Sequence, residues 1–73
     1  MAKIEPKVTH IVWGTRAALL REYATLDAYA GKYLVQPIGD AEWDAEGFAS
    51  KAEAKAEAKA LAAIYNAPTE WVA

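Results

Sequence analysis

Residues 50–65 constrain the fold most, because their alanines and charged residues repeat with the period of an α-helix. At about 100° per residue the charges separate onto two stripes, one formed by Lys51, Lys55 and Lys59 and the other by Glu53 and Glu57. Opposite charges stand two residues apart and do not face each other, whereas like charges at i,i+4 repel by about 0.2–0.5 kcal/mol per pair. One interpretation is that the two charged flanks are solvated and border a buried seam formed by Ala54, Ala58, Leu61 and Tyr65. The other is that the charged residues form a docking face.

The ends of this helix are marked by local signals. Ser50 and Glu53 have the spacing of a capping box, in which the serine oxygen accepts the amide of the third helical residue. Asn66 tolerates the left-handed turn after a helix, and Pro68 cannot continue one. We therefore predict a helix that begins after residue 50 and ends before residue 66, followed by a closing strand at 69–72.

The first half of the chain predicts a strand, a helix and a second strand. Residues 8–13 are β-branched and aromatic and end at Gly14. Over 15–30, apolar residues recur at helical spacing and Thr15 can cap the start, although residues 20–25 and 29–35 also suit extended segments. A strand at 33–36 is expected to stop at Pro37 and the Gly39-Asp40 turn, and the acidic residues 40–47 to form a loop or hairpin arm.

Together these elements predict a small α+β domain spanning residues 1–73, with residues 1–7 as a flexible lead-in. Its sheet would have three mostly antiparallel strands covered on one face by the alanine-rich helix, with an extra helix at about 15–30. The other sheet face, or the sheet edges, would remain for a partner.

Composition restricts the class of protein. The 73 residues suffice for one domain, and 18 of the 40 hydrophobic residues are alanine, which leaves 22 larger hydrophobic side chains for the core, eight of them aromatic. The chain has no cysteine, no apolar signal segment and no membrane-length apolar run, which favours a soluble intracellular protein. The net charge of −2 argues against non-specific duplex binding.

Catalysis and metal binding find little support. With one histidine, one serine and no cysteine, no nucleophile has an obvious base, so we expect no catalytic residues, no cofactor and no enzyme activity. Residues 42–53 carry oxygen ligands and a glycine at spacings similar to a calcium-binding EF-hand loop. Glutamate replaces aspartate at two positions, however, and Pro37 and Gly39 exclude an entering helix. A solvated acidic loop is the simpler interpretation, and we expect no metal site.

The first third of the chain gathers basic and aromatic residues. Arginine and tryptophan are enriched at the centres of protein interfaces, so the candidate partner-binding residues are Lys3, Lys7, His10, Trp13, Arg16 and Arg21. The alternative is that Trp13 belongs to the core, His10 is an ordinary strand residue and the cations keep the protein soluble. RNA binding would be expected to come with more positive charge and a recognisable motif.

In length and in its start, Met-Ala-Lys-Ile-Glu-Pro-Lys-Val-Thr-His-Ile-Val-Trp, the chain resembles small host-takeover proteins of lytic bacteriophages, specifically polymerase-binding transcription regulators of Xanthomonas phages. The resemblance implies a non-catalytic protein of the host cytoplasm that binds bacterial RNA polymerase, with neither membrane nor specific DNA as partner. It further implies contact with the largest subunit near the RNA exit channel, interference with the sigma factor and antitermination. The alternatives are a small nucleic-acid- or calcium-binding module and a structural accessory protein.

Overall fold

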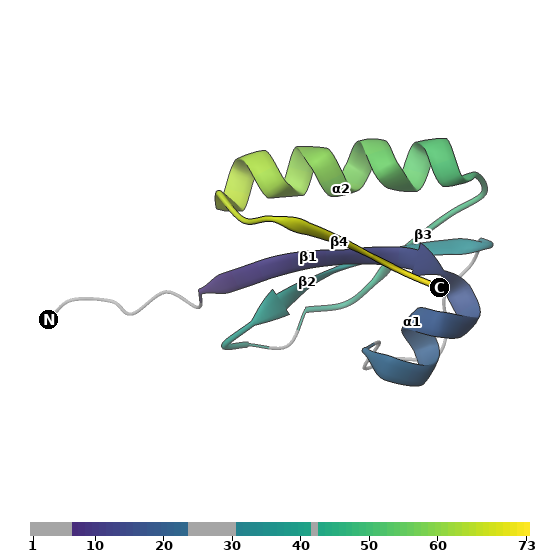
Figure 1. Cartoon of the computed structure of the whole chain (residues 1–73), viewed down its shortest axis with the longest axis horizontal. Coiled ribbons are helices and arrows are strands. Elements are labelled where there is room, and N and C mark those ends of the chain that lie inside the picture. The colour runs from purple at the N-terminus through teal and green to yellow at the C-terminus, as the bar shows by residue number, and fades with distance from the viewer. Residues whose placement is uncertain (1–6, 24–30, 42) are drawn as a thin grey trace, which may run out of the picture.

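The computed structural model describes residues 7–23, 31–41 and 43–73, which form a four-stranded sheet and two helices (Figure 1). In chain order the elements are β1 Val8–Thr15, α1 Arg16–Glu22, β2 Tyr33–Gly39, β3 Glu46–Phe48, α2 Lys51–Tyr65 and β4 Thr69–Val72. The strand order is β3-β2-β1-β4, in which β1 and β4 run parallel and the other neighbours antiparallel. The α+β class is confirmed, with one strand more than predicted because the acidic hairpin arm supplies β3.

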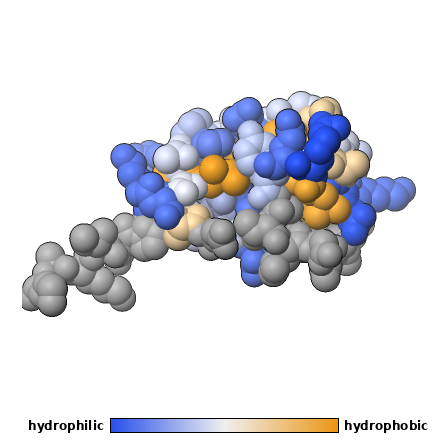
Figure 2. Space-filling view, turned by 90° about the horizontal axis from the view of Figure 1, so that it is seen from below, coloured by the Kyte–Doolittle hydropathy of each residue, from blue (hydrophilic) through white to orange (hydrophobic). Residues whose placement is uncertain are grey.

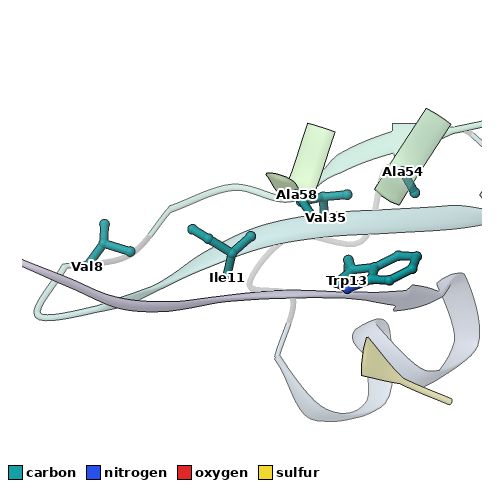
Figure 3. Close-up of a cluster of buried hydrophobic side chains, with 6 residues drawn as sticks. All are labelled: Val8, Ile11, Trp13, Val35, Ala54 and Ala58. Atoms are coloured by element: carbon teal, nitrogen blue, oxygen red, sulfur yellow. The ribbon is translucent and has the colours of Figure 1, made fainter. Parts of the chain in front are cut away.

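One face of the sheet packs against α2. Its core joins Val8, Ile11 and Trp13 of β1, Val35 of β2, and Ala54 and Ala58 of α2 (Figure 3). The alanine side chains are short, which allows the helix backbone to lie close to the sheet. The predicted seam is buried at its two alanines and half-buried at Leu61, whereas Tyr65 in the last turn is 40% exposed.

Both ends of α2 follow the predicted local chemistry. The Ser50 oxygen accepts the Glu53 amide at 3.2 Å, and the serine hydroxyl donates to the Glu53 carboxylate at 2.9 Å. At the other end Asn66 has the left-handed conformation, with φ of 52°. The serine cap and the stop at Asn66 are therefore confirmed, whereas the Glu53 carboxylate accepts from the Ser50 hydroxyl rather than from the Ser50 amide as a full capping box requires. β4 follows where the closing strand was expected.

α1 packs on the opposite face of the sheet, so the prediction that this face remains for a partner is wrong where the helix lies. The alternative, that the sheet edges remain for a partner, stays a prediction. Ala18 and Leu19 of α1 lie in a second buried cluster that also contains Val12, Leu34, Ala45 and Val72. The predicted helix over 15–30 is confirmed for Arg16–Glu22, capped by Thr15 and ending at Tyr23. Residues 24–30, including the predicted helical position Leu26, lie outside the described part of the chain.

Two predicted strand ends are wrong. β2 continues through Pro37 to Gly39. Its pairing with β3 ends at Val35, so on the β3 side of Pro37 no described strand requires a backbone N–H, and a proline is tolerated there. β1 continues through Gly14 to Thr15. A Cβ on Gly14 would lie 1.8 Å from the carbonyl oxygen of Val72, so this glycine allows β4 to pair closely with β1 rather than ending the strand.

Candidate protein-interaction surface

The basic residues predicted to bind a partner lie at two ends of β1. Lys7 precedes the strand and is exposed, whereas Arg16 and Arg21 are exposed on α1, which follows the strand. At about 3.3 Å per residue, Lys7 and Arg16 are roughly 30 Å apart along the strand. The structure therefore brings the two arginines onto one short helix and separates them from Lys7. Lys3 lies outside the described residues.

His10 lies between these ends, on the side of the sheet that α1 covers. Its Nε2 is 3.8 Å from a carboxylate oxygen of Glu70 on β4, and its Nδ1 is 2.9 Å from the hydroxyl oxygen of Thr9. The His10 side chain is 28% exposed and that of Glu70 is 56% exposed. An ion pair this accessible to water contributes little to stability. Because both side chains are partly exposed, both remain accessible to a partner.

Trp13 faces the other way and lies in the core under α2, where it is only 9% exposed. Its ring packs edge-on against Trp71 of β4, with ring centroids 4.7 Å apart and planes at 67°. This is the core role that the sequence left open as an alternative for Trp13. Trp13 therefore offers little surface for direct contact with a partner, whereas its neighbour on the sheet edge is more exposed.

Trp71 is that neighbour and is 39% exposed. Tyr33 lies on its inner side at 6.5 Å between ring centroids, and the Lys51 ammonium nitrogen lies 4.5 Å from the Trp71 ring centroid. We call Trp71, Tyr33 and Lys51 the aromatic edge. A cation against an aromatic ring at such a site contributes about 0.5–1 kcal/mol, and a half-exposed tryptophan beside a cation has the chemistry of an interface centre.

Sequence analysis missed the aromatic edge, although it placed Trp71 in a strand. The strand alternates Thr69 and Trp71 on one face with Glu70 and Val72 on the other, a signal that the residues do carry. Local sequence pattern does not reveal that this strand lies at the edge of the sheet or that Lys51 begins a helix above it. Both depend on tertiary structure.

The charged flanks of α2 face water. Lys55 and Lys59 are exposed and Glu57 is half-buried. Among the described residues, the lysines and glutamates of these two stripes form no ion pair with one another. The structure thus keeps the two flanks as separate basic and acidic surfaces.

The acidic segment has become part of the sheet. Glu46, Gly47 and Phe48 form β3, and the Gln36 side-chain amide donates to the Trp43 carbonyl at 2.8 Å, which ties the segment to β2. The side-chain oxygen of Gln36 is buried without a hydrogen-bond partner among the residues described. Glu53, the last position of the calcium-like pattern, is engaged in the helix cap. The described acidic and histidine residues form no group of three that could hold a metal ion.

On the α1 side of the molecule, the described residues form no single broad apolar area. In Figure 2, hydrophilic side chains project around smaller hydrophobic areas on the part of this face that is described. No pocket is found over the described residues, so any partner there would bind to an open surface. None of the described helices combines the length and the apolar character needed to cross a membrane.

Comparison of the chain with protein-family models, with curated proteins and with solved structures yields no match.

Proposed function

We propose that this protein is a non-catalytic transcription regulator that binds host bacterial RNA polymerase. The observation that carries the proposal is the exposed pair of arginines on α1, at the end of the sheet where β1 stops. Arginine offers a planar, permanently charged group that suits carboxylate-rich protein surfaces. From the resemblance to phage host-takeover proteins we infer that the partner with this carboxylate-rich surface is RNA polymerase.

The separated charges of the molecule fit such a partner. Polymerase carries both acidic and basic surfaces, and this chain has arginines on α1, carboxylates at Asp40 and Asp44, and two flanks of opposite sign on α2. Complementary charges speed association and fix orientation more than they raise affinity. A small rigid domain with several charged surfaces can therefore be oriented by several weak contacts together.

Binding at the start of the largest subunit, near the RNA exit channel, is the site that the resemblance implies. A protein held there would interfere with the sigma factor at promoters and would favour read-through at terminators by an elongating polymerase. The protein itself makes and breaks no covalent bond in this proposal. It acts on transcription only by binding to polymerase.

Charge reversal on the exposed basic residues tests the proposal. We expect Arg16→Glu and Arg21→Glu each to weaken polymerase binding, and the double variant to weaken it about tenfold, which corresponds to about 1.4 kcal/mol. Binding is measured by fluorescence anisotropy of labelled protein titrated with core polymerase at moderate salt. Circular dichroism of each variant verifies that the domain still folds.

Lys59→Glu is the matched control, since it makes the same charge change at an exposed position on α2, away from α1. We expect Lys59→Glu to weaken binding less than the single variant Arg16→Glu does, because the α1 arginines are the main contact in this proposal and the α2 flank a weaker one. If the folded double variant binds as tightly as the original protein, the two α1 arginines are not in the interface. Absence of binding by the original protein would contradict the proposed function itself.

A further inference from the structure

The outer edge of β4 has backbone groups that point away from the sheet. β4 is the last strand in the order β3-β2-β1-β4, so its outer side pairs with no described strand. The Ile11 N–H donates to the Pro68 carbonyl at 2.8 Å where the parallel pairing begins. Because successive residues of a strand direct their N–H and C=O groups to alternate sides, Glu70 and Val72 bond to β1, whereas Thr69 and Trp71 direct theirs outward.

The same alternation places the side chains. Trp71 lies on the face that α2 covers, opposite Trp13, and Glu70 lies on the α1 face beside His10. α2 packs mainly on β1 and β2, where its buried alanines meet Ile11 and Val35, so the helix does not cover the outer edge of β4. A strand can therefore approach this edge and meet both the outward backbone groups and the exposed part of Trp71.

We propose that this edge pairs antiparallel with β4 of a second copy of the chain, with Trp71 opposite Trp71 on the two-fold axis. In that register the outward N–H and C=O groups of Trp71 bond reciprocally to those of its copy, as a hydrogen-bonded antiparallel pair requires. Thr69 then stands opposite Ala73 of the other copy, and the two four-stranded sheets become one continuous sheet. The exposed tryptophan surfaces are buried against each other at its centre.

Charge selects this register over its neighbour. With Trp71 on the axis, Glu70 stands directly opposite Val72 of the other copy, so no two carboxylates face each other across the new pair. A shift that placed Glu70 on the axis would oppose two carboxylates and would present residues whose backbone bonds are already used by β1. Of these two registers, the one with Trp71 on the axis therefore fits a second copy better.

Like charges nevertheless remain near the axis. The two Glu70 residues become diagonal neighbours, which in antiparallel sheets lie about 7–8 Å apart, and both Lys51 residues lie on the α2 face near Trp71. Salt screens such exposed charges. We therefore expect a weak dimer that forms more readily as ionic strength rises, which is the opposite of the salt dependence expected for charge-guided docking on polymerase.

Cysteine cross-linking tests the register directly, because the chain has no cysteine of its own. Residues in a hydrogen-bonded antiparallel pair have Cα atoms about 5.5 Å apart, within the range that a disulfide spans. Under mild oxidation, an equimolar mixture of Thr69→Cys and Ala73→Cys proteins is expected to form a disulfide-linked heterodimer. Each variant alone, and Glu70→Cys alone, is expected to form several-fold less.

Sedimentation velocity of the original protein over a wide concentration range supplies the second measurement, without polymerase and therefore independent of the proposed function. A concentration-dependent shift from monomer to dimer, increased by salt and reduced by Thr69→Pro, supports the pairing. Thr69→Pro removes one outward N–H and none that bonds to β1. A monomer at every concentration and salt would overturn the proposal, as would equal cross-linking of Glu70→Cys.

Discussion

At the scale of single residues, Gly14 determines whether β4 joins the sheet. Gly14 is the last of four consecutive buried residues of β1, and a Cβ there would lie 1.8 Å from the Val72 carbonyl oxygen. The obstacle is backbone, which cannot swing aside as a side chain can. Gly14 is thus required by the close approach of a neighbouring strand.

We expect Gly14→Ala to lower the free energy of unfolding by about 1–3 kcal/mol, the usual range for overpacking in a core. The added methyl group forces β4 away from β1 and disturbs the contact between Trp13 and Trp71. Urea unfolding followed by circular dichroism measures the change, and tryptophan fluorescence reports the displaced ring. Stability equal to that of the original protein would mean that β4 can shift without loss.

Trp71 itself stabilises the domain through partly exposed contacts. We expect Trp71→Ala to lower the free energy of unfolding by about 1–3 kcal/mol, less than for a fully buried tryptophan, because the ring is 39% exposed. Trp71→Phe keeps an aromatic ring beside Trp13 and Lys51 and should recover about half of that loss. Urea titrations of both variants provide the comparison. If Trp71→Ala and Trp71→Phe lower the free energy of unfolding equally, the stabilisation comes from the indole nitrogen or from the size of the indole ring.

At the scale of elements, α2 is specified by its own sequence more completely than any other part. Ser50, Glu53 and Asn66 lie within or beside the helix and act on backbone groups a few residues away. Local chemistry of this kind can be predicted without knowing the fold. The predicted start, end and buried alanines therefore agree with the structure.

The cap is expected to contribute measurably to stability. Ser50→Ala removes the oxygen that accepts the Glu53 amide and should lower the free energy of unfolding by about 1 kcal/mol. Ser50→Asp is the matched variant, since it keeps an acceptor at the same place and adds a charge that the helix N-terminus favours. Chemical unfolding of the two variants should therefore differ. A Ser50→Asp protein as unstable as Ser50→Ala would show that the hydroxyl donation to Glu53 matters more than the cap.

The strands and the first helix were less predictable, for reasons that lie outside their own sequences. Whether Pro37 ends β2 depends on how far β3 extends beside it, which the segment 33–36 does not reveal. The role of α1 as a cover for the second sheet face depends on the packing of Leu19 against Leu34 and Val72. Likewise the separation of Lys7 from Arg16 follows from the length of β1, and only tertiary structure places Trp71 at an edge.

At the scale of the whole molecule, the domain combines a two-sided core with surfaces of separate character. α1 carries exposed arginines, α2 carries a basic and an acidic flank, and β4 offers backbone groups and a tryptophan. The arginines proposed to bind polymerase and the β4 edge proposed to pair with a second copy consist of different residues. The two proposals are therefore separable, and binding to polymerase is the central one.

Size-exclusion chromatography of the protein mixed with purified bacterial RNA polymerase tests that claim most directly, with core enzyme and holoenzyme run in parallel at moderate salt. The account predicts co-elution with core enzyme, and loss of sigma factor from the fraction of holoenzyme that carries the protein. Co-elution with holoenzyme that retains all its sigma factor would contradict the proposed action on initiation. Failure to co-elute with either form would contradict the central claim.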